Sequence, residues 1–169
     1  IPALKRIKAP ITLAVLPGLP YSRQISREMG KNGFEIVLHM PMEPLGNEPL
    51  EKNTITSRMS KKMVSLALKE GLSSLENVKG VSNHMGSRAT ADERVMGIVM
   101  ADLRKDNLYF LDSYVVSGSI CRRVALKKGI PFASRDIFLD NKSDPYYIKG
   151  QLEKLKNKAK ARFCFRDRA

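Results

Sequence analysis

Histidine, cysteine and tryptophan are nearly missing from this chain of 169 residues, which holds two histidines, two cysteines and no tryptophan. So few ligand-type side chains exclude a Cys-rich or Cys/His zinc finger. The two cysteines, Cys121 and Cys164, are compatible with one disulfide, two free thiols or two buried small hydrophobic side chains. They therefore do not indicate a redox compartment.

Long apolar runs are also absent. No stretch approaches the roughly 18 uninterrupted apolar residues of a membrane-spanning helix, so no transmembrane span is expected. Residues 3–20, ALKRIKAPITLAVLPGLP, place basic residues ahead of an apolar run in the manner of a signal peptide. The run itself, Ile11 to Leu16, is short and bounded by prolines, which favours a buried strand and no signal peptide in this chain.

Acidic residues are too few to balance the basic ones, and the formal net charge is +13 with a pI near 9.9. Such a charge suits a polyanionic partner. Residues 149–169 carry eight Lys or Arg against Glu153 and Asp167, a net charge of +6. No aromatic residues that could stack on bases alternate with these basic ones, and no RNA-recognition motif occurs. We expect a solvated basic helix and no nucleic-acid partner.

Apolar segments of strand type alternate with segments of helical periodicity along the chain. The expected strands are residues 11–16, 34–38, 77–82, 108–113 and 130–134. The expected helices are residues 21–31, 56–75, 90–107, 117–128 and 144–161, with Thr90 and Glu93 forming a capping box. This alternation predicts an α/β fold, a mostly parallel sheet with covering helices that is either open or closed into a barrel.

Polar residues end the later strands of this pattern. His39 ends the second strand, His84 the third and Asp112 the fourth, and Arg135 and Asp136 follow the fifth. Ligands bind and catalysis occurs at the carboxyl ends of parallel strands, because the loops there converge on one mouth. We therefore expect these five residues to form a site.

Two neutral imidazoles and a carboxylate are a normal set of ligands for a divalent metal such as zinc. A metal held in this way acidifies a bound water and polarises a carbonyl, which suits hydrolysis of an ester or amide. The metal-free alternative is one histidine acting as a general base, but no Ser or Cys lies in a GxSxG context. Walker and dinucleotide glycine motifs are absent as well, which disfavours nucleotide binding.

Each of these residues also has a structural interpretation. A lone histidine is commonly a buried imidazole bonded to a carbonyl. Asp112 could be a turn or capping carboxylate, and Arg135 with Asp136 could be an ion pair that holds a loop. Core packing explains the methionines next to the histidines, Met40, Met42 and Met85.

Four ordered segments carry a family resemblance: EIVLHMPMEP (35–44), GVSNHMGSRAT (80–90), LYFLDS (108–113) and GIPFASRDIFLDN (129–141). Together they resemble the bacterial divergent polysaccharide deacetylase family, over residues 11 to 161. The resemblance implies a NodB-like irregular (β/α) barrel and metal-dependent removal of acetyl groups from N-acetylated glycans. It also implies export, hence a periplasmic or secreted location.

By the same resemblance, His39 and His84 match the family's metal ligands, with zinc the expected ion. Asp112, Arg135 and Asp136 match its other polar motif positions and are the expected catalytic residues. Asp140 matches a further motif position.

Two parts of the family pattern have no counterpart here: a first strand with paired aspartates and a final strand with a Gly-His-Pro motif. We therefore expect residues 1–169 to form a single, partial domain with an incomplete barrel. Open sheet edges are an association hazard, so self-association is expected.

Two functional hypotheses follow. The chain is a metal-dependent deacetylase-like hydrolase acting on acetylated carbohydrate, weakly active or inactive alone. Alternatively, it is a non-catalytic carbohydrate- or envelope-binding module on the same barrel.

Overall fold

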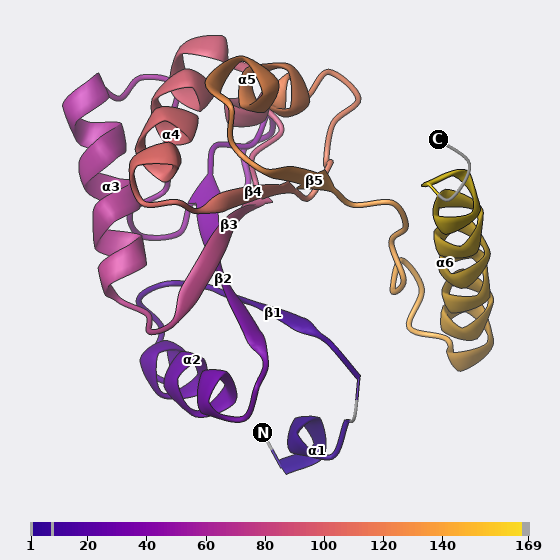
Figure 1. Ribbon diagram of the computed structural model, residues 1–169. Coiled ribbons are helices and arrows are strands. Elements are labelled where there is room, and N and C mark those ends of the chain that lie inside the picture. The colour runs from indigo at the N-terminus through magenta and orange to yellow at the C-terminus, as the bar shows by residue number, and fades with distance from the viewer. Residues whose placement is uncertain (1, 8, 167–169) are drawn as a thin grey trace. The chain divides into compact units, whose positions relative to one another are not determined.

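Five parallel strands form one sheet in the order β1-β2-β3-β4-β5 (Figure 1). The computed structural model describes residues 2–7 and 9–166. The strands are β1 (Thr12–Val15), β2 (Glu35–Met42), β3 (Val78–Met85), β4 (Tyr109–Asp112) and β5 (Phe132–Ser134). The α/β class and the parallel sheet expected from the sequence are confirmed, and β1 and β5 are its two edge strands.

The helices are α1 (Pro2–Lys5), α2 (Ser22–Lys31), α3 (Lys61–Ser73), the 3-10 turn η1 (Ala89–Ala91), α4 (Glu93–Lys105), α5 (Cys121–Lys128) and α6 (Pro145–Arg166). Helices α2 to α5 connect successive strands, α1 precedes β1 and α6 follows β5. None of the helices within the described ranges is long and apolar enough to cross a membrane. The chain divides into two units, residues 1–134 and 135–169, and the sheet belongs to the first. A single domain over residues 1–169 stays a prediction.

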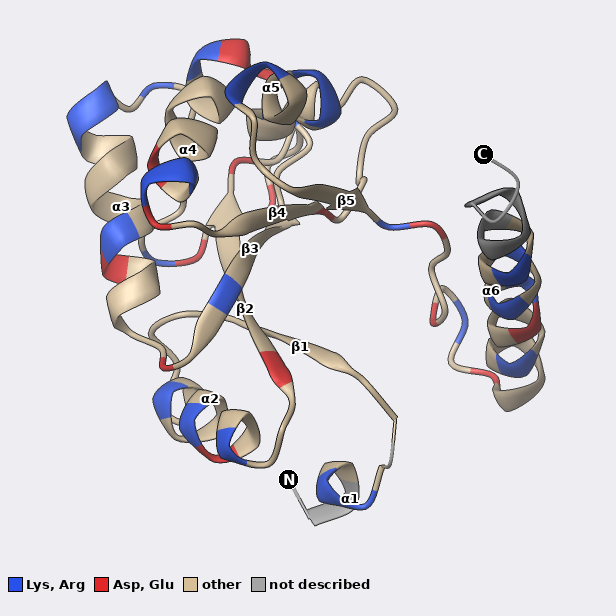
Figure 2. Ribbon diagram, in the orientation of Figure 1, with Lys and Arg blue, Asp and Glu red and all other residues tan. Residues whose placement is uncertain are grey.

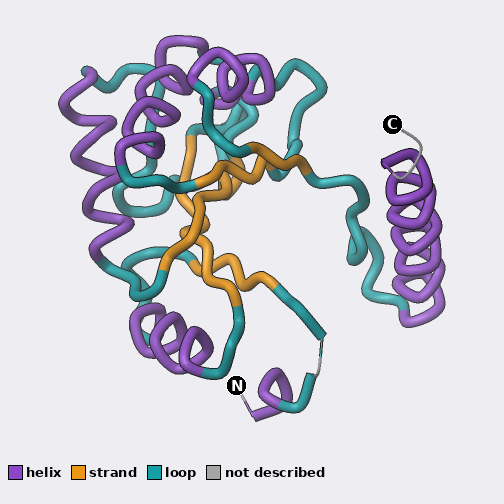
Figure 3. The backbone as a smooth tube through the Cα atoms, viewed as in Figure 1, coloured by secondary structure: helices purple, strands orange, loops and turns teal. Residues whose placement is uncertain are grey.

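The hydrophobic core of the first unit lies between one face of the sheet and helices α2 to α5. In Figure 3 these helices follow the outside of the curved sheet. Fully buried side chains from every layer meet there, among them Met29, Leu38, Leu68, Val99 and Phe110. Sequential parallel strands with short right-handed connections place all the connecting helices on the same face. The opposite face of the sheet is therefore available for polar side chains.

A β-bulge in β3 decides which side chains reach that opposite face. Ile36 pairs with Val78, but the next pair is Val37 with Gly80, so Lys79 is an extra residue. Because side chains alternate between faces with a period of two, one extra residue reverses the facing of everything after it. Val78 packs on the core, whereas Gly80 and the alternate residues after it face the other way.

Two strands, β2 and β3, run further than the sequence suggested, and β3 extends to Met85. Prolines were expected to end β2 at His39, yet β2 continues to Met42 through Pro41. β1 ends at Val15, opposite Leu38, so beyond that point β2 has no β1 partner that would need the missing N–H. Ile55 takes the place of β1 there, because its N–H donates to the Pro41 carbonyl at 2.9 Å.

The capping box predicted at Thr90 and Glu93 is wrong. Asp92 is the N-cap of α4, and its carboxylate accepts from the Val95 N–H at 2.9 Å. The Thr90 hydroxyl instead donates to the Gly86 carbonyl at 2.7 Å. Asp and Thr are both good caps, so the sequence alone did not decide between residues two positions apart.

Cys121 is a free, fully buried thiol at the start of α5. Burial raises the pKa of this thiol to about 12, so it is unreactive at neutral pH. Cys164 lies outside the described side chains.

The second unit is built on the basic helix α6 (Figure 2). The Gln151 side chain donates to the Phe138 carbonyl at 3.0 Å, which ties the helix to the segment before it. Lys158 pairs with Asp136 at 2.8 Å.

Gly80 gives a test of the sheet's packing. A Cβ at this position would lie 2.7 Å from the Tyr109 ring, which must then move and weaken the 2.7 Å hydrogen bond from its hydroxyl to Glu35. We expect Gly80→Ala to lower the free energy of unfolding by about 1–3 kcal/mol in urea titrations. The matched control is Gly97→Ala in α4, where nothing lies within 4 Å of the new Cβ. It should gain roughly 0.5–1 kcal/mol. Equal stability of the two variants would contradict this packing.

Candidate functional site

His39 and His84 lie side by side on the face of the sheet away from the helices. His39 pairs in register with Ser82, and Pro41 pairs with His84, so the histidines are diagonal neighbours on adjacent strands. Their ring centroids are 5.1 Å apart, with the rings at 69° to each other. The two histidines that the sequence predicted at one edge are therefore brought together by the fold.

Ser82 orients the His39 ring. The His39 Nδ1 atom and the Ser82 hydroxyl oxygen are 2.8 Å apart, a hydrogen bond between neighbouring strands. When Nδ1 carries the proton of this bond, Nε2 has a lone pair available to a metal. Burial, together with the neighbouring His84, lowers the pKa of His39 to about 4. This imidazole is thus neutral at physiological pH, the form that binds metal ions.

The separation of the two imidazole rings equals that expected for half of a zinc site. Two imidazoles on one tetrahedral zinc, each at about 2.0–2.1 Å, place their ring centroids roughly 5 Å apart. The observed separation of 5.1 Å agrees with this value. Within the described residues, however, no group of three or more His, Cys, Asp or Glu side chains could hold a metal ion. The two imidazoles suit the ion, and the described side chains do not complete its coordination.

Asp112, predicted as a catalytic residue, is held by its own loop. The residue is 2% exposed. One carboxylate oxygen accepts from the Tyr114 N–H at 2.8 Å, and the other accepts from the Ser119 hydroxyl at 2.6 Å. These bonds fix the turn between β4 and α5, which is the turn role that the sequence left open for Asp112.

Arg135 and Asp136 are the first residues of the second unit, directly after β5. The Arg135 guanidinium lies 4.2 Å from the centroid of the Phe138 ring, a cation-π contact. Asp136 pairs with Lys158 of α6 at 2.8 Å. Both residues therefore have structural contacts within their own unit, and a direct part in the site stays a prediction.

The turn after His84 has an unusual backbone. Met85 has a φ of +54°, which an L-residue with a bulky side chain rarely adopts, and Gly86 follows at +93°. The buried Asn83 side chain holds this turn by donating to the Met85 carbonyl at 2.7 Å. It also accepts from the Ser113 N–H at 2.9 Å, linking the loops after β3 and β4. Strain of this kind is retained where surrounding contacts fix it, commonly at functional sites.

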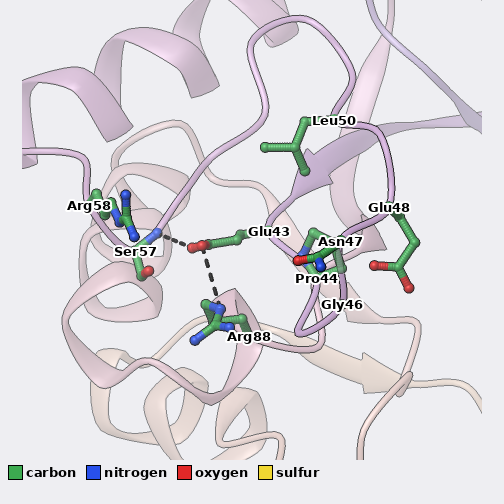
Figure 4. A pocket seen from close by; sticks show the side chains of 9 residues that line it. All are labelled: Glu43, Pro44, Gly46, Asn47, Glu48, Leu50, Ser57, Arg58 and Arg88. Carbon is green, nitrogen blue, oxygen red and sulfur yellow. Dashed lines mark hydrogen bonds and ion pairs between the residues drawn. The ribbon is translucent and has the colours of Figure 1, made fainter.

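A cavity of about 440 Å³ opens beside these loops (Figure 4). Glu43, directly after β2, forms part of its wall. Its carboxylate accepts from the Ser57 N–H and pairs with Arg88 at 3.5 Å. Burial alone would raise the pKa of Glu43, but the hydrogen bonds from Ser57 and the charges of Arg88 and Arg58 outweigh it and lower the pKa.

Sequence reasoning missed Ser82, Asn83 and the cavity. Ser82 lies two residues before His84, and a period of two places both on one face, so strand periodicity could have indicated it. Asn83 is polar inside an apolar strand, but nothing local predicts its bonds to Met85 and to the next loop. Arg58 lies far from both histidines in sequence, and no motif includes it.

Fold and site together define the class of protein. It is a parallel α/β unit with a histidine pair toward the carboxyl ends of its strands. The profile of the divergent polysaccharide deacetylase family matches residues 2–163, and the chain belongs to this family.

Two bacterial relatives agree with this assignment. The chain is 34% identical over 144 residues to the uncharacterized protein YibQ of Escherichia coli, covering 85% of this chain and 45% of YibQ. It is 33% identical over 134 residues to an uncharacterized protein of Haemophilus influenzae, covering 79% of this chain and 48% of that protein. The chain thus spans about half the length of these curated relatives.

A crystal structure of an uncharacterized protein from Agrobacterium tumefaciens has the same fold. It matches with a TM-score of 0.84 and 25% identity, over 89% of this chain and 62% of that one.

The lowered pKa of His39 predicts a loss of stability in acid. The unfolded chain takes up a proton near pH 6.5, whereas folded His39 does so only near pH 4. The unfolded state therefore binds more protons between these values, and stability falls as pH decreases through this window. At about 1.4 kcal/mol per pKa unit the loss is up to about 3 kcal/mol.

Urea unfolding of the wild type and His39→Gln between pH 7 and 4 measures this loss of stability. Carboxylates titrate in both proteins, so the difference between the two curves isolates His39. Parallel curves would contradict a half-buried, neutral His39 imidazole.

Proposed function

We propose that the chain is a deacetylase-like domain that binds acetylated glycan and a divalent metal, zinc by preference, through His39 and His84. The observation that carries the proposal is the histidine pair, with its centroid separation of 5.1 Å and the hydrogen bond to Ser82. Membership in the divergent polysaccharide deacetylase family supports the substrate class. A periplasmic or secreted location and self-association through the edge strands β1 and β5 are part of the same proposal.

A bound divalent ion would acidify a water molecule and polarise the acetyl carbonyl. His39 is suited to hold it, because Ser82 fixes the ring and burial keeps it uncharged. Asp136 and Arg135 stay proposed catalytic residues; within their own unit Asp136 pairs with Lys158 and Arg135 lies over Phe138. Asp112 acts in this proposal through the loop that it holds, since Tyr114 and Ser119 already occupy its carboxylate.

The alternative is a carbohydrate-binding module without turnover. The carboxylate of Asp112 is engaged, and the described residues bring no third metal ligand to the histidines. Both observations favour slow or absent catalysis by this chain alone, while glycan binding needs neither a base nor a complete metal site.

Zinc titration tests the histidine pair. In a Cys164→Ser background, which removes the thiol outside the described side chains, we expect weak binding of one zinc per chain by calorimetry. His84→Gln should weaken it at least roughly tenfold, because a single imidazole remains. The double variant with His39→Gln lacks every imidazole of the chain and is the baseline. Equal zinc binding by the single variant and its parent would show that the histidine pair does not bind the ion.

Acetate release from N-acetylchitohexaose tests the enzyme hypothesis. A missing positioned general base lowers the rate by roughly 10²- to 10⁴-fold, so we expect little release by the purified chain even with zinc. Binding of the hexamer without release would favour the non-catalytic module. Rapid release that a chelator stops and His39→Gln abolishes would contradict the expected inactivity.

A further inference from the structure

The cavity beside Glu43 lies at a fixed place relative to the histidines. It is formed by the segment after β2 and the turn after β3, and Arg58 comes from the segment that leads into α3. Glu43 follows His39 by four residues on extended chain, which places them about 13 Å apart along β2. That spacing suits two sugar residues of one glycan chain rather than a single sugar.

The Glu43 carboxylate is part of the cavity's framework. It accepts from the Ser57 N–H and pairs with Arg88. Its backbone carbonyl also accepts from the Arg88 N–H at 3.0 Å and the Ala89 N–H at 3.1 Å. With its charge balanced and its pKa lowered, Glu43 stays ionised and is not a proton donor to a ligand at neutral pH.

Two guanidinium groups flank Glu43 and retain donors for a ligand (Figure 4). Arg88 uses Nε for Glu43 and one terminal nitrogen for the Leu45 carbonyl at 3.3 Å. Arg58 is exposed and, among the described residues, has no hydrogen-bond or ion-pair partner. On this side of the cavity a single carboxylate faces two cations, while the second carboxylate of the lining, Glu48, lies on the opposite wall, so positive charge is concentrated on the side of Arg58 and Arg88. A planar carboxylate is the group that guanidinium donors bind in bidentate fashion.

The opposite wall has a different character. Asn47 and Glu48 lie there and offer an amide and a carboxylate, and Leu50 contributes an apolar surface. Amide and carboxylate groups bind sugar hydroxyls, while an aliphatic side chain covers the C–H face of a sugar ring.

We propose that this cavity binds a carboxylate-bearing sugar residue of the glycan. The sugar carboxylate lies on Arg58 and the remaining donors of Arg88, and its hydroxyls lie on Asn47 and Glu48. The inference rests on the proposed function and extends it, because it specifies an acidic sugar at a second position of the chain.

Calorimetry with three glycans tests the inference: a hyaluronan hexasaccharide, which alternates glucuronic acid with N-acetylglucosamine, its carboxyl-reduced form, and N-acetylchitohexaose. The wild type should bind the hyaluronan hexamer more tightly than the carboxyl-reduced form. Arg58→Gln should lower the affinity for the hyaluronan hexamer roughly tenfold or more and leave that for N-acetylchitohexaose unchanged.

Arg27→Gln is the matched control, because it removes an equal charge from an exposed position on α2. It separates the cavity from the general attraction of a chain with net charge +13 for polyanions. Equal losses in the two variants, or equal binding of hyaluronan and its reduced form, would overturn the inference alone. If no glycan binds, both this inference and the proposed function are wrong.

Discussion

The extra residue in β3 is the constraint on which the site depends. Side chains on neighbouring parallel strands share a face only when their register agrees, and the bulge at Lys79 shifts that register by one. Without it, His84 would point into the helical layer while His39 remained on the opposite face. Gly80 permits the bulge, because the Tyr109 ring occupies the space where a Cβ would lie. A packing detail at the start of β3 therefore makes a two-imidazole site possible at its far end.

Strand and helix order could be predicted from the sequence because each segment carries its own periodicity and bounding residues. The α/β class follows from that alternation alone. Boundaries were less predictable where tertiary contacts act: Pro41 continues β2 since β1 has already ended, and Asp92 rather than Thr90 caps α4. In each case the deciding partner is remote in sequence, or two equally good candidates lie close together. Local preference sets the order of elements, and packing sets their limits.

The candidate site likewise has parts that the sequence predicts and parts that depend on remote contacts. His39 and His84 were predictable because both end apolar runs of strand type, and strand ends of a parallel sheet converge. The turn role of Asp112 was an open alternative, and only the structure shows its bonds to Tyr114 and Ser119. The cavity was beyond sequence reasoning, because the pairing of Glu43 with Arg88 joins loops 45 residues apart. Charge on a loop does not reveal its partner until the fold brings the loops together.

His39 and the cavity differ in charge, although both lie at the same end of strands β2 and β3. His39 lies where burial removes its charge, whereas Glu43 and Arg88 keep theirs because each compensates the other. Glu43 follows His39 by four residues, and Arg88 follows His84 by four, so the second pair lies just beyond the two strands that carry the first. Because the Glu43 backbone is bonded to both Ile55 and Arg88, the distance between the pairs cannot change without breaking these bonds. A glycan held by charge at the cavity would therefore present a different sugar, at a fixed spacing, to the histidine pair.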